Sequence, residues 1–399
     1  MRKRRLTYLV SFTAALTIAL AATAASQART ADDTIKIGSI TILTGPSSQI
    51  GIETARGAQF MVDYLNAKGG VLGKKLQLIS TDDVNNPQLA VQDAAQLIQQ
   101  DRVVAIVGPT NSVGGIAIQP LQAQAHVPAV AYQSGAEALT ATGSPWIFRS
   151  NTTLNHHFDA ITSYFAKVRH AKRFAFIGWN LAAGQSSLAG TKFGISQNRG
   201  TSLVYQTQLP LTTQDFSGPI AQAKAANPDV VLIGAPMPFA GVLAKQIRQS
   251  GWNVPIAATG DFVTTDFGAF LGPFANGLVM SDTGHPTCAS KRKVGRAFVA
   301  AWQKKFHRVP IANELVGADA VGVVAAALKK ARSTDGQKLA DAIRKLQYNG
   351  IRFTARWDSK GNLRHTPIPA VVWAKNGTRL NALTCDIQPI VHLNKKNKK

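Results

Sequence analysis

Three segments between Thr34 and Ser112 decide the fold class, and they read IKIGSITILTGPSSQIG (residues 35–51), YLNAKGGVLGKKLQLISTDDVNNP (64–87) and AAQLIQQDRVVAIVGPTNS (94–112). Short apolar runs alternate in them with glycine-marked turns and amphipathic segments, a pattern typical of parallel strands covered by helices on both faces. The third segment carries an apolar run straight into Gly108-Pro109-Thr110-Asn111-Ser112. A buried parallel strand that ends at the start of a helix presents backbone N–H groups to a small polar ligand. The sequence therefore predicts an α/β fold with a binding site at its strand ends.

The same alternation continues through most of the chain. A second α/β series runs from a helix at 154–168 to a strand in NGLVMSD (276–282). Three helices without intervening strands follow, and after them come three β-like segments, IRFTARWD (351–358), PAVVWAKNG (369–377) and IQPIVHL (387–393). We expect the three helices to return and cover the first sheet, and the β-like end to rejoin the second.

This order predicts two doubly wound parallel-sheet lobes joined by a hinge of three strands, near Ser150, Thr283 and Tyr348. The expected division gives residues 29–150 and 284–347 to an N-terminal lobe, 151–283 and 348–392 to a C-terminal lobe, and 393–399 to a basic tail.

The N-terminus has the pattern of an export signal. Arg2-Lys3-Arg4-Arg5 precedes an apolar run from Leu6 to about Ala25, and Ser26-Gln27-Ala28 supplies a cleavage site. We predict a signal peptide over residues 1–28 and a soluble mature protein in the periplasm. The alternative is an uncleaved anchor, which the small residues in the distal half of the run disfavour.

The distribution of charge bears on the partner of this protein, and its cysteine content bears on a disulfide. The formal net charge is +23, but Lys and Arg are scattered without an interleaved aromatic platform, so we do not expect a nucleic-acid partner. The two cysteines, Cys288 and Cys385, are compatible with one long-range disulfide or with two buried thiols.

Patterns for catalysis, metals and cofactors are weak. The sequence contains no GxxxxGK[ST] loop, no GxGxxG after a strand and no GxSxG elbow. His156, His157 and Asp159 do not form a metal site because adjacent histidines point to different sides of a helix, and we interpret them as a solvated first helical turn. We therefore expect no cofactor and no enzyme activity.

Polar residues at strand ends are the candidates for ligand binding. Ser112 stands where it can cap the next helix and hold a carboxylate or carbonyl oxygen. Other candidates lie at corresponding points in both lobes, and each has the alternative of an ordinary loop residue: Gln49, Asn111, Gln133, Ser134, Gly135, Trp179, Asn180, Pro236 and Asp261.

Taken in order, six segments resemble the leucine/isoleucine/valine-binding protein family of ABC-transporter receptors. They are TGPSSQIG, YLNAKGGVLGKKL, TDDVNNP, AIVGPTNS, ALT (residues 138–140) after the second strand, and WDSKGNL. The resemblance implies a type I periplasmic binding protein that closes two lobes around a small ligand, acts as a monomer and has an ABC permease as partner. The alternative is a ligand-sensing receptor that regulates without transport.

Within this resemblance, Ser112 matches the serine that holds the ligand carboxylate. Several other positions depart from the family: Gly135 replaces a threonine, Ala183 a tyrosine before Gly184, and Pro236 falls near another aromatic position. The acidic partner of a ligand ammonium falls at Gly260 or, with a shift of one residue, at Asp261. The ligand class therefore stays open between an amino acid, an organic or aromatic acid, and an amide.

Overall fold

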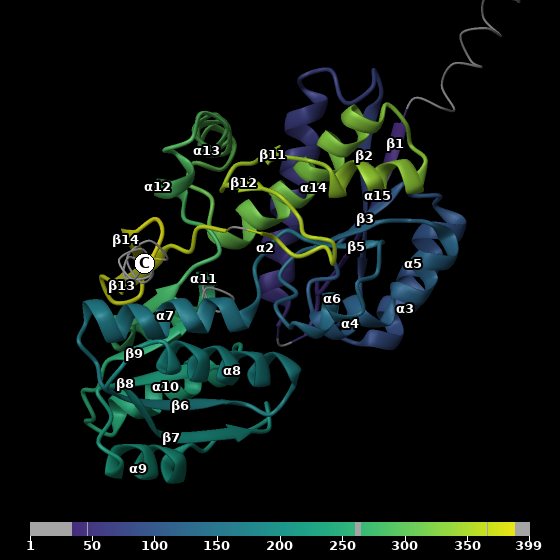
Figure 1. The fold of residues 1–399 in the computed structure, drawn as a ribbon. Helices are drawn as coiled ribbons and strands as arrows, with labels where there is room; N and C mark the ends of the chain where they lie inside the picture. Colours follow the sequence, from purple (N-terminus) through teal and green to yellow (C-terminus); the bar gives the residue numbers. More distant parts are fainter. Residues whose placement is uncertain (1–33, 46, 260–264, 365, 388–399) are drawn as a thin grey trace, which may run out of the picture.

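The computed structural model describes residues 34–387 except 46, 260–264 and 365, and it divides them between two α/β lobes (Figure 1). The first lobe is built on a five-stranded parallel sheet with the order β2-β1-β3-β4-β5. Its strands are β1 (Thr34–Thr41), β2 (Lys75–Asp82), β3 (Ala105–Val107), β4 (Ala129–Ala131) and β5 (Ile147–Arg149). Its helices are α2 (Ser48–Asn66), α3 (Pro87–Ala95) with a π-helical continuation (Gln96–Gln100), α4 (Ser112–Ala117), α5 (Gln119–Ala125) and α6 (Ala138–Ala141).

The second lobe carries a seven-stranded sheet with the order β14-β13-β10-β9-β8-β6-β7. Its strands are β6 (Arg173–Trp179), β7 (Ser202–Leu209), β8 (Val230–Gly234), β9 (Ile256–Thr259), β10 (Val279–Ser281), β13 (Ala370–Ala374) and β14 (Arg379–Thr384). The last two strands are antiparallel additions at one edge. Its helices are α7 (Leu154–Val168), α8 (Ala182–Ser196), α9 (Ser217–Ala225), α10 (Phe239–Gln249), α11 (Thr265–Leu271) and a 3-10 turn (Gly272–Ala275).

Four helices among the described residues return to the first lobe after β10, the three expected from the sequence and the short helix α12 before them. They are α12 (Pro286–Ala289), α13 (Lys293–Phe306), α14 (Ala312–Ala331) and α15 (Gly336–Arg344). Their apolar side chains share one buried core with Ile35 and Ile37 of β1. The doubly wound, two-lobed fold predicted from the sequence is thus confirmed.

Helices α14 and α2 approach so closely that their contact admits only glycine. A Cβ atom on Gly57 would lie 1.9 Å from the carbonyl oxygen of Glu314, and one on Gly317 would lie 2.0 Å from that of Thr54. This close approach brings together the polar residues near the start of both helices, which pack in one core with the first sheet.

The end of the chain differs from the expected division of the lobes. Ile351, Phe353 and Trp357 pack in the core of the first lobe, around the short hairpin of β11 (Tyr348–Asn349) and β12 (Thr354–Ala355), whereas Ile368 packs in the second. The third crossover therefore lies between residues 357 and 368 rather than at Tyr348, because the apolar side chains of the β-like IRFTARWD segment are buried against the first lobe. The strand β14 was not predicted, although the Asn376-Gly377 turn before it is a hairpin signal. IQPIVHL lies outside the described residues apart from Ile387.

The guanidinium of Arg352 holds the hinge together from the first lobe. It forms a buried ion pair with Asp319 of α14, with Nε 2.9 Å from Oδ2 and side chains only 2% and 4% exposed. It also donates hydrogen bonds to the carbonyl oxygens of Thr283 (3.0 Å) and Ser150. These two carbonyls belong to the second and first crossovers, so one side chain of the first lobe fastens both.

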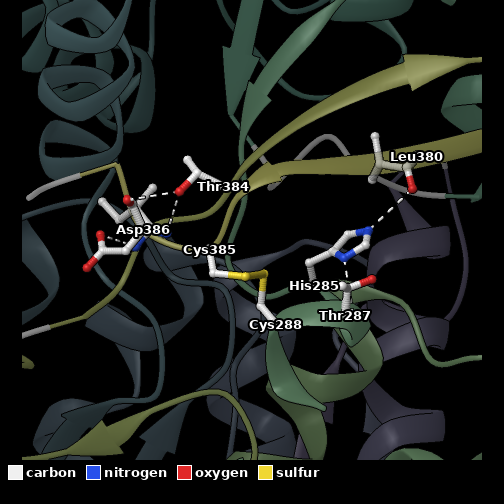
Figure 2. Close-up of a disulfide and its surroundings, with 8 residues drawn as sticks. His285, Thr287, Cys288, Leu380, Thr384, Cys385 and Asp386 are labelled. Carbon is white, nitrogen blue, oxygen red and sulfur yellow. Dashed lines mark hydrogen bonds between the residues drawn. A yellow bond between two sulfur atoms is a disulfide. The ribbon is translucent and has the colours of Figure 1, made fainter. Parts of the chain in front are cut away.

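A disulfide between Cys288 and Cys385 links the same region covalently (Figure 2). Cys288 lies on α12, whose Ala289 is part of the first core, and Cys385 follows β14 of the second sheet. Beside it, His285 Nε2 lies 3.3 Å from the carbonyl oxygen of Leu380. The disulfide therefore connects the two lobes in addition to the three crossovers.

The expectation of a solvated turn at the start of α7 is wrong for His157. Its side chain is buried, at 1% exposure, because α7 packs against α8 and against strands β9 and β10 of the second sheet. Neither ring nitrogen has a hydrogen-bond partner. Burial lowers the pKa of His157 to about 3, and the charges of His156 and Arg352 act in the same direction.

We predict that replacing both cysteines by serine lowers the free energy of unfolding by about 2–5 kcal/mol, because the disulfide closes a loop between residues 97 apart. Urea unfolding of the double variant and of reduced wild-type protein should give the same loss. Equal stability of oxidised wild type and variant would contradict this role.

We also predict that His157 makes the protein acid-sensitive. In the unfolded chain a histidine takes up a proton near pH 6.5, whereas folded His157 does so only near pH 3, so the unfolded state is favoured as the pH falls through this window. From pH 7 to pH 5, the free energy of unfolding of the wild type should fall by about 2 kcal/mol more than that of His157→Gln.

Urea unfolding at both pH values measures this difference. The exposed His170 supplies a control, because His170→Gln should keep the pH dependence of the wild type. Parallel profiles for wild type and His157→Gln would show that His157 is not the group responsible.

Candidate ligand-binding site

A cavity of about 240 Å³ lies between the lobes, where strands of both sheets end. From the first lobe it is lined by the segments that follow β1, β2, β3 and β4, and from the second by segments that follow β6, β7 and β8 and by the start of α7. The lining residues are Ile42, Ser47, Ile50, Asn85, Thr110, Asn111, Ser112, Val113, Gln133, Gly135, Leu154, Trp179, Leu181, Ala182, Ala183, Ser187, Leu211 and Pro236.

Ser112 lines this cavity, but its role in the helix differs from the expected one. The helix cap is Asn111, whose Oδ1 accepts a hydrogen bond from the N–H of Gly114 at 2.6 Å. The Ser112 oxygen instead accepts from the N–H of Ala136 at 3.0 Å. Because this bond uses the oxygen as an acceptor, the hydroxyl hydrogen is available for donation to a ligand oxygen.

The segment after β4 divides between cavity and core. Gln133 and Gly135 line the cavity, and the carbonyl of Gly135 accepts a hydrogen bond from the N–H of Leu154 in the second lobe at 2.8 Å. Ser134 does not line it, because its hydroxyl is buried and donates to the carbonyl of Pro109 at 3.1 Å.

The wall from the second lobe is mainly apolar. Trp179 is the last residue of β6, and Leu181, Leu211 and Pro236 extend the same wall. Beside them Ala183 presents only a methyl group. The aromatic side chains that the family resemblance would place at Ala183 and near Pro236 are thus absent from these two positions.

Two further candidates, Gln49 and Asn180, do not line the cavity. Gln49 donates to Glu53 at 2.9 Å instead. Asn180 is exposed, and its N–H donates to the carbonyl of Leu209. Asp261 lies outside the described residues.

None of the side chains that line the cavity in the described part of the chain is charged. Asp83 of the first lobe contacts this lining: it is buried and accepts a hydrogen bond from Asn111 at 3.4 Å. Burial raises the pKa of Asp83 to about 6, and the charges of Asp93 and Asp82 add to this effect. The described residues also hold no cluster of His, Cys, Asp and Glu suited to a metal ion.

Sequence reasoning missed most of the apolar wall. Ile42, Leu181 and Leu211 each follow a strand, and the same strand-end rule that selected the polar candidates would have found them. Asn85, with φ of 61°, stands in a left-handed turn after β2 that the TDDVNNP segment signals.

No helix among the described residues has the length and apolar character to cross a membrane.

Comparison with known proteins agrees with this architecture. The chain is 28% identical over 326 residues to the Leu/Ile/Val-binding protein BraC3 of Rhizobium johnstonii, which covers 79% of this chain and 87% of that protein. A leucine-binding protein from Thermotoga maritima matches the structure with a TM-score of 0.80 at 25% identity, over 88% of this chain and 98% of that one. A solute-binding protein of an ABC transporter from Rhodopseudomonas palustris, in complex with 3,4-dihydroxybenzoic acid, gives 0.76 at 26% identity, over 88% and 96%.

These similarities confirm the fold of a type I periplasmic binding protein that the sequence segments indicated. Residues 34–378, from β1 to the turn before β14, match the family described as periplasmic binding protein. The chain therefore belongs to the periplasmic binding protein family.

Proposed function

We propose that this protein captures a small carboxylic acid with an apolar or aromatic body and delivers it to an ABC permease. As a member of its family it binds a solute for transport and is not an enzyme. Two of the similar proteins define the alternatives for the ligand: one is named for leucine, isoleucine and valine, and another was solved with 3,4-dihydroxybenzoic acid.

The observation that carries the proposal is the uneven chemistry of the cavity. The first lobe offers the Ser112 hydroxyl and amide groups, whereas the second offers Trp179 and aliphatic side chains. A carboxylate would accept from the first lobe while its apolar body contacts the second. A ligand ammonium would need a carboxylate partner, and no described lining residue supplies one. The cavity of about 240 Å³ also suits a small solute.

Capture follows from contacts with both lobes. A ligand favours closure only if it binds the closed form more tightly than the open one. A hydrogen bond to Ser112 alone would form equally well in the open and the closed form. The contact with Trp179 and its neighbours on the other lobe is therefore what makes the ligand bind the closed form more tightly. The alternative of a sensing receptor without transport has no observation in its favour.

The remaining parts of the proposal concern location and assembly. We infer export by the signal peptide over residues 1–28, a mature chain in the periplasm and a monomer that presents its closed form to the permease.

The first test concerns the carboxylate contact. Ser112→Ala should weaken binding of the preferred carboxylate by about tenfold or more, since a hydrogen bond to a charged group contributes about 1.5–3 kcal/mol. Calorimetric titration measures this change. Ser134→Ala is the matched control, because its hydroxyl is directed to the carbonyl of Pro109 and its loss should leave affinity unchanged. Equal affinities of Ser112→Ala and wild type would remove Ser112 from the site.

The second test concerns the class of ligand. A thermal-shift screen of amino acids, aliphatic and aromatic monocarboxylates and their amides should give the largest rise in Tm with a monocarboxylate, because a ligand present at about 100 times its Kd adds about 2.7 kcal/mol to stability. A larger rise with leucine or another amino acid than with every monocarboxylate would contradict the proposal.

A further inference from the structure

A chain of four buried side chains runs from α2 to the first crossover, and we call Glu53, Asn313, Gln133 and Asn151 the amide relay. Asn313 Nδ2 donates to Glu53 Oε2 at 2.7 Å. Gln133 Nε2 donates to Asn313 Oδ1 at 2.5 Å, and Asn151 Nδ2 donates to Gln133 Oε1 at 2.8 Å. The four residues come from α2, α14, the loop after β4 and the first crossover, which are far apart in the sequence.

The donor-to-acceptor direction of the hydrogen bonds in the amide relay is fixed at both ends. Both carboxyl oxygens of Glu53 accept hydrogen bonds from amides, Oε1 from Gln49 at 2.9 Å and Oε2 from Asn313 at 2.7 Å, so the NH2 group of Asn313 faces Glu53. The oxygen of Asn313 then faces Gln133 and accepts from its NH2 group. At the other end, Asn151 Oδ1 accepts from the backbone N–H of Thr152 at 2.9 Å, which leaves its NH2 group for Gln133. Reversal of any one amide would place two NH2 groups, or two oxygen atoms, opposite each other, where they cannot form a hydrogen bond.

The relay is well shielded from water. Glu53 and Asn313 are fully buried, and Asn151 and Gln133 are 3% and 5% exposed. Buried polar groups without partners are costly, and hydrogen bonds in a chain polarise one another. These conditions favour a single arrangement over a mixture of flipped amides.

Gln133 is the member of the relay that lines the ligand cavity. Its bonds within the relay use one N–H and one lone pair of the amide, so one N–H and one lone pair are left for a ligand. Asn151 stands next to Ser150, whose carbonyl accepts from Arg352 at the hinge. The relay thus joins a wall of the binding site to a crossover.

The neighbouring Glu314 shows how differently a second buried carboxylate is used. It is also fully buried, but it pairs with the guanidinium groups of Arg56, at 2.9 Å, and Arg308. Glu53 instead accepts from the amides of Gln49 and Asn313. Glu314 thus forms ion pairs with two cations, whereas Glu53 accepts from two amides, of which Asn313 leads to the cavity.

We propose that Glu53 and Asn313 are positioning residues for ligand recognition: they fix which face of the Gln133 amide is presented to the ligand and couple it, through Asn151, to the first crossover. Neither residue lines the cavity. The inference rests on the proposed function only in taking the cavity as the ligand site, and not on the class of ligand.

The decisive variants move the carboxylate along the relay. Glu53→Gln keeps the shape of the side chain but allows the amides to adopt either direction. In Glu53→Gln/Asn313→Asp, residue 313 becomes the group that only accepts, and the Gln133 NH2 group must again face it. The double variant should therefore restore the original direction without the original carboxylate. Glu314→Gln is the matched control for loss of a buried carboxylate from the same pair of helices.

The binding readout is the ratio of affinities for a carboxylate and its primary amide, because only the amide can donate as well as accept. The probes are benzoate and benzamide, or leucine and leucinamide if the screen returns an amino acid. We expect Glu53→Gln to change this ratio at least threefold, the double variant to return it to the wild-type value, and Glu314→Gln to leave it unchanged even if stability falls.

A second readout needs no ligand. With 15N-labelled glutamine and asparagine, the side-chain NH2 signals of Gln133, assigned through Gln133→Ala, should shift or double in Glu53→Gln and return in the double variant. An unchanged affinity ratio together with unchanged Gln133 signals in Glu53→Gln would overturn the inference. Failure of every monocarboxylate to bind would instead count against the proposed ligand class, since the leucine pair tests the relay in that case.

Discussion

The buried guanidinium of Arg352 is the interaction on which the two-lobed arrangement depends. It is paired with Asp319 inside the first lobe and donates to backbone carbonyls of the first and second crossovers. A buried cation that lost its partner would cost about 3–5 kcal/mol, so these four groups are held together rather than merely adjacent. The disulfide beside them adds a covalent link between the lobes. The hinge is therefore a compact, defined region on which two otherwise separate cores can close.

The cavity that we propose as the ligand site lies between the two lobes that this hinge joins. Each sheet ends at the gap with its own chemistry, hydrogen-bonding groups on the first lobe and the Trp179 wall on the second. A solute that satisfies both must bring them together, which is how a binding protein turns recognition into a change of shape. The amide relay also links the cavity to the hinge, because it connects Gln133 in the cavity wall with Asn151 at a crossover.

Much of this fold follows from sequence patterns alone. Continuous apolar runs such as RFAFIGW form strands because both faces of a parallel sheet are covered, and helix α7 spans the predicted residues 154–168. The pattern failed where burial depended on distant partners. The segment IRFTARWD has the spacing of a strand, but its apolar side chains pack on the first lobe. His157 looks like a polar residue in a first helical turn, yet the packing of α7 against the sheet removes it from water.

The sequence by itself determined the α/β class, the two-lobed order and the strand ends at which Ser112, Gln133 and Trp179 stand, because these depend on local periodicity and on turns between neighbouring elements. Only the tertiary structure decided which strand-end residues face one cavity, that Asn111 rather than Ser112 caps α4, and that Glu53 reaches Gln133 through Asn313. The cavity and the amide relay rest on contacts between residues far apart in the sequence, 260 positions in the case of Glu53 and Asn313. Local sequence patterns do not predict such contacts, because they form only when separate helices and strands pack together.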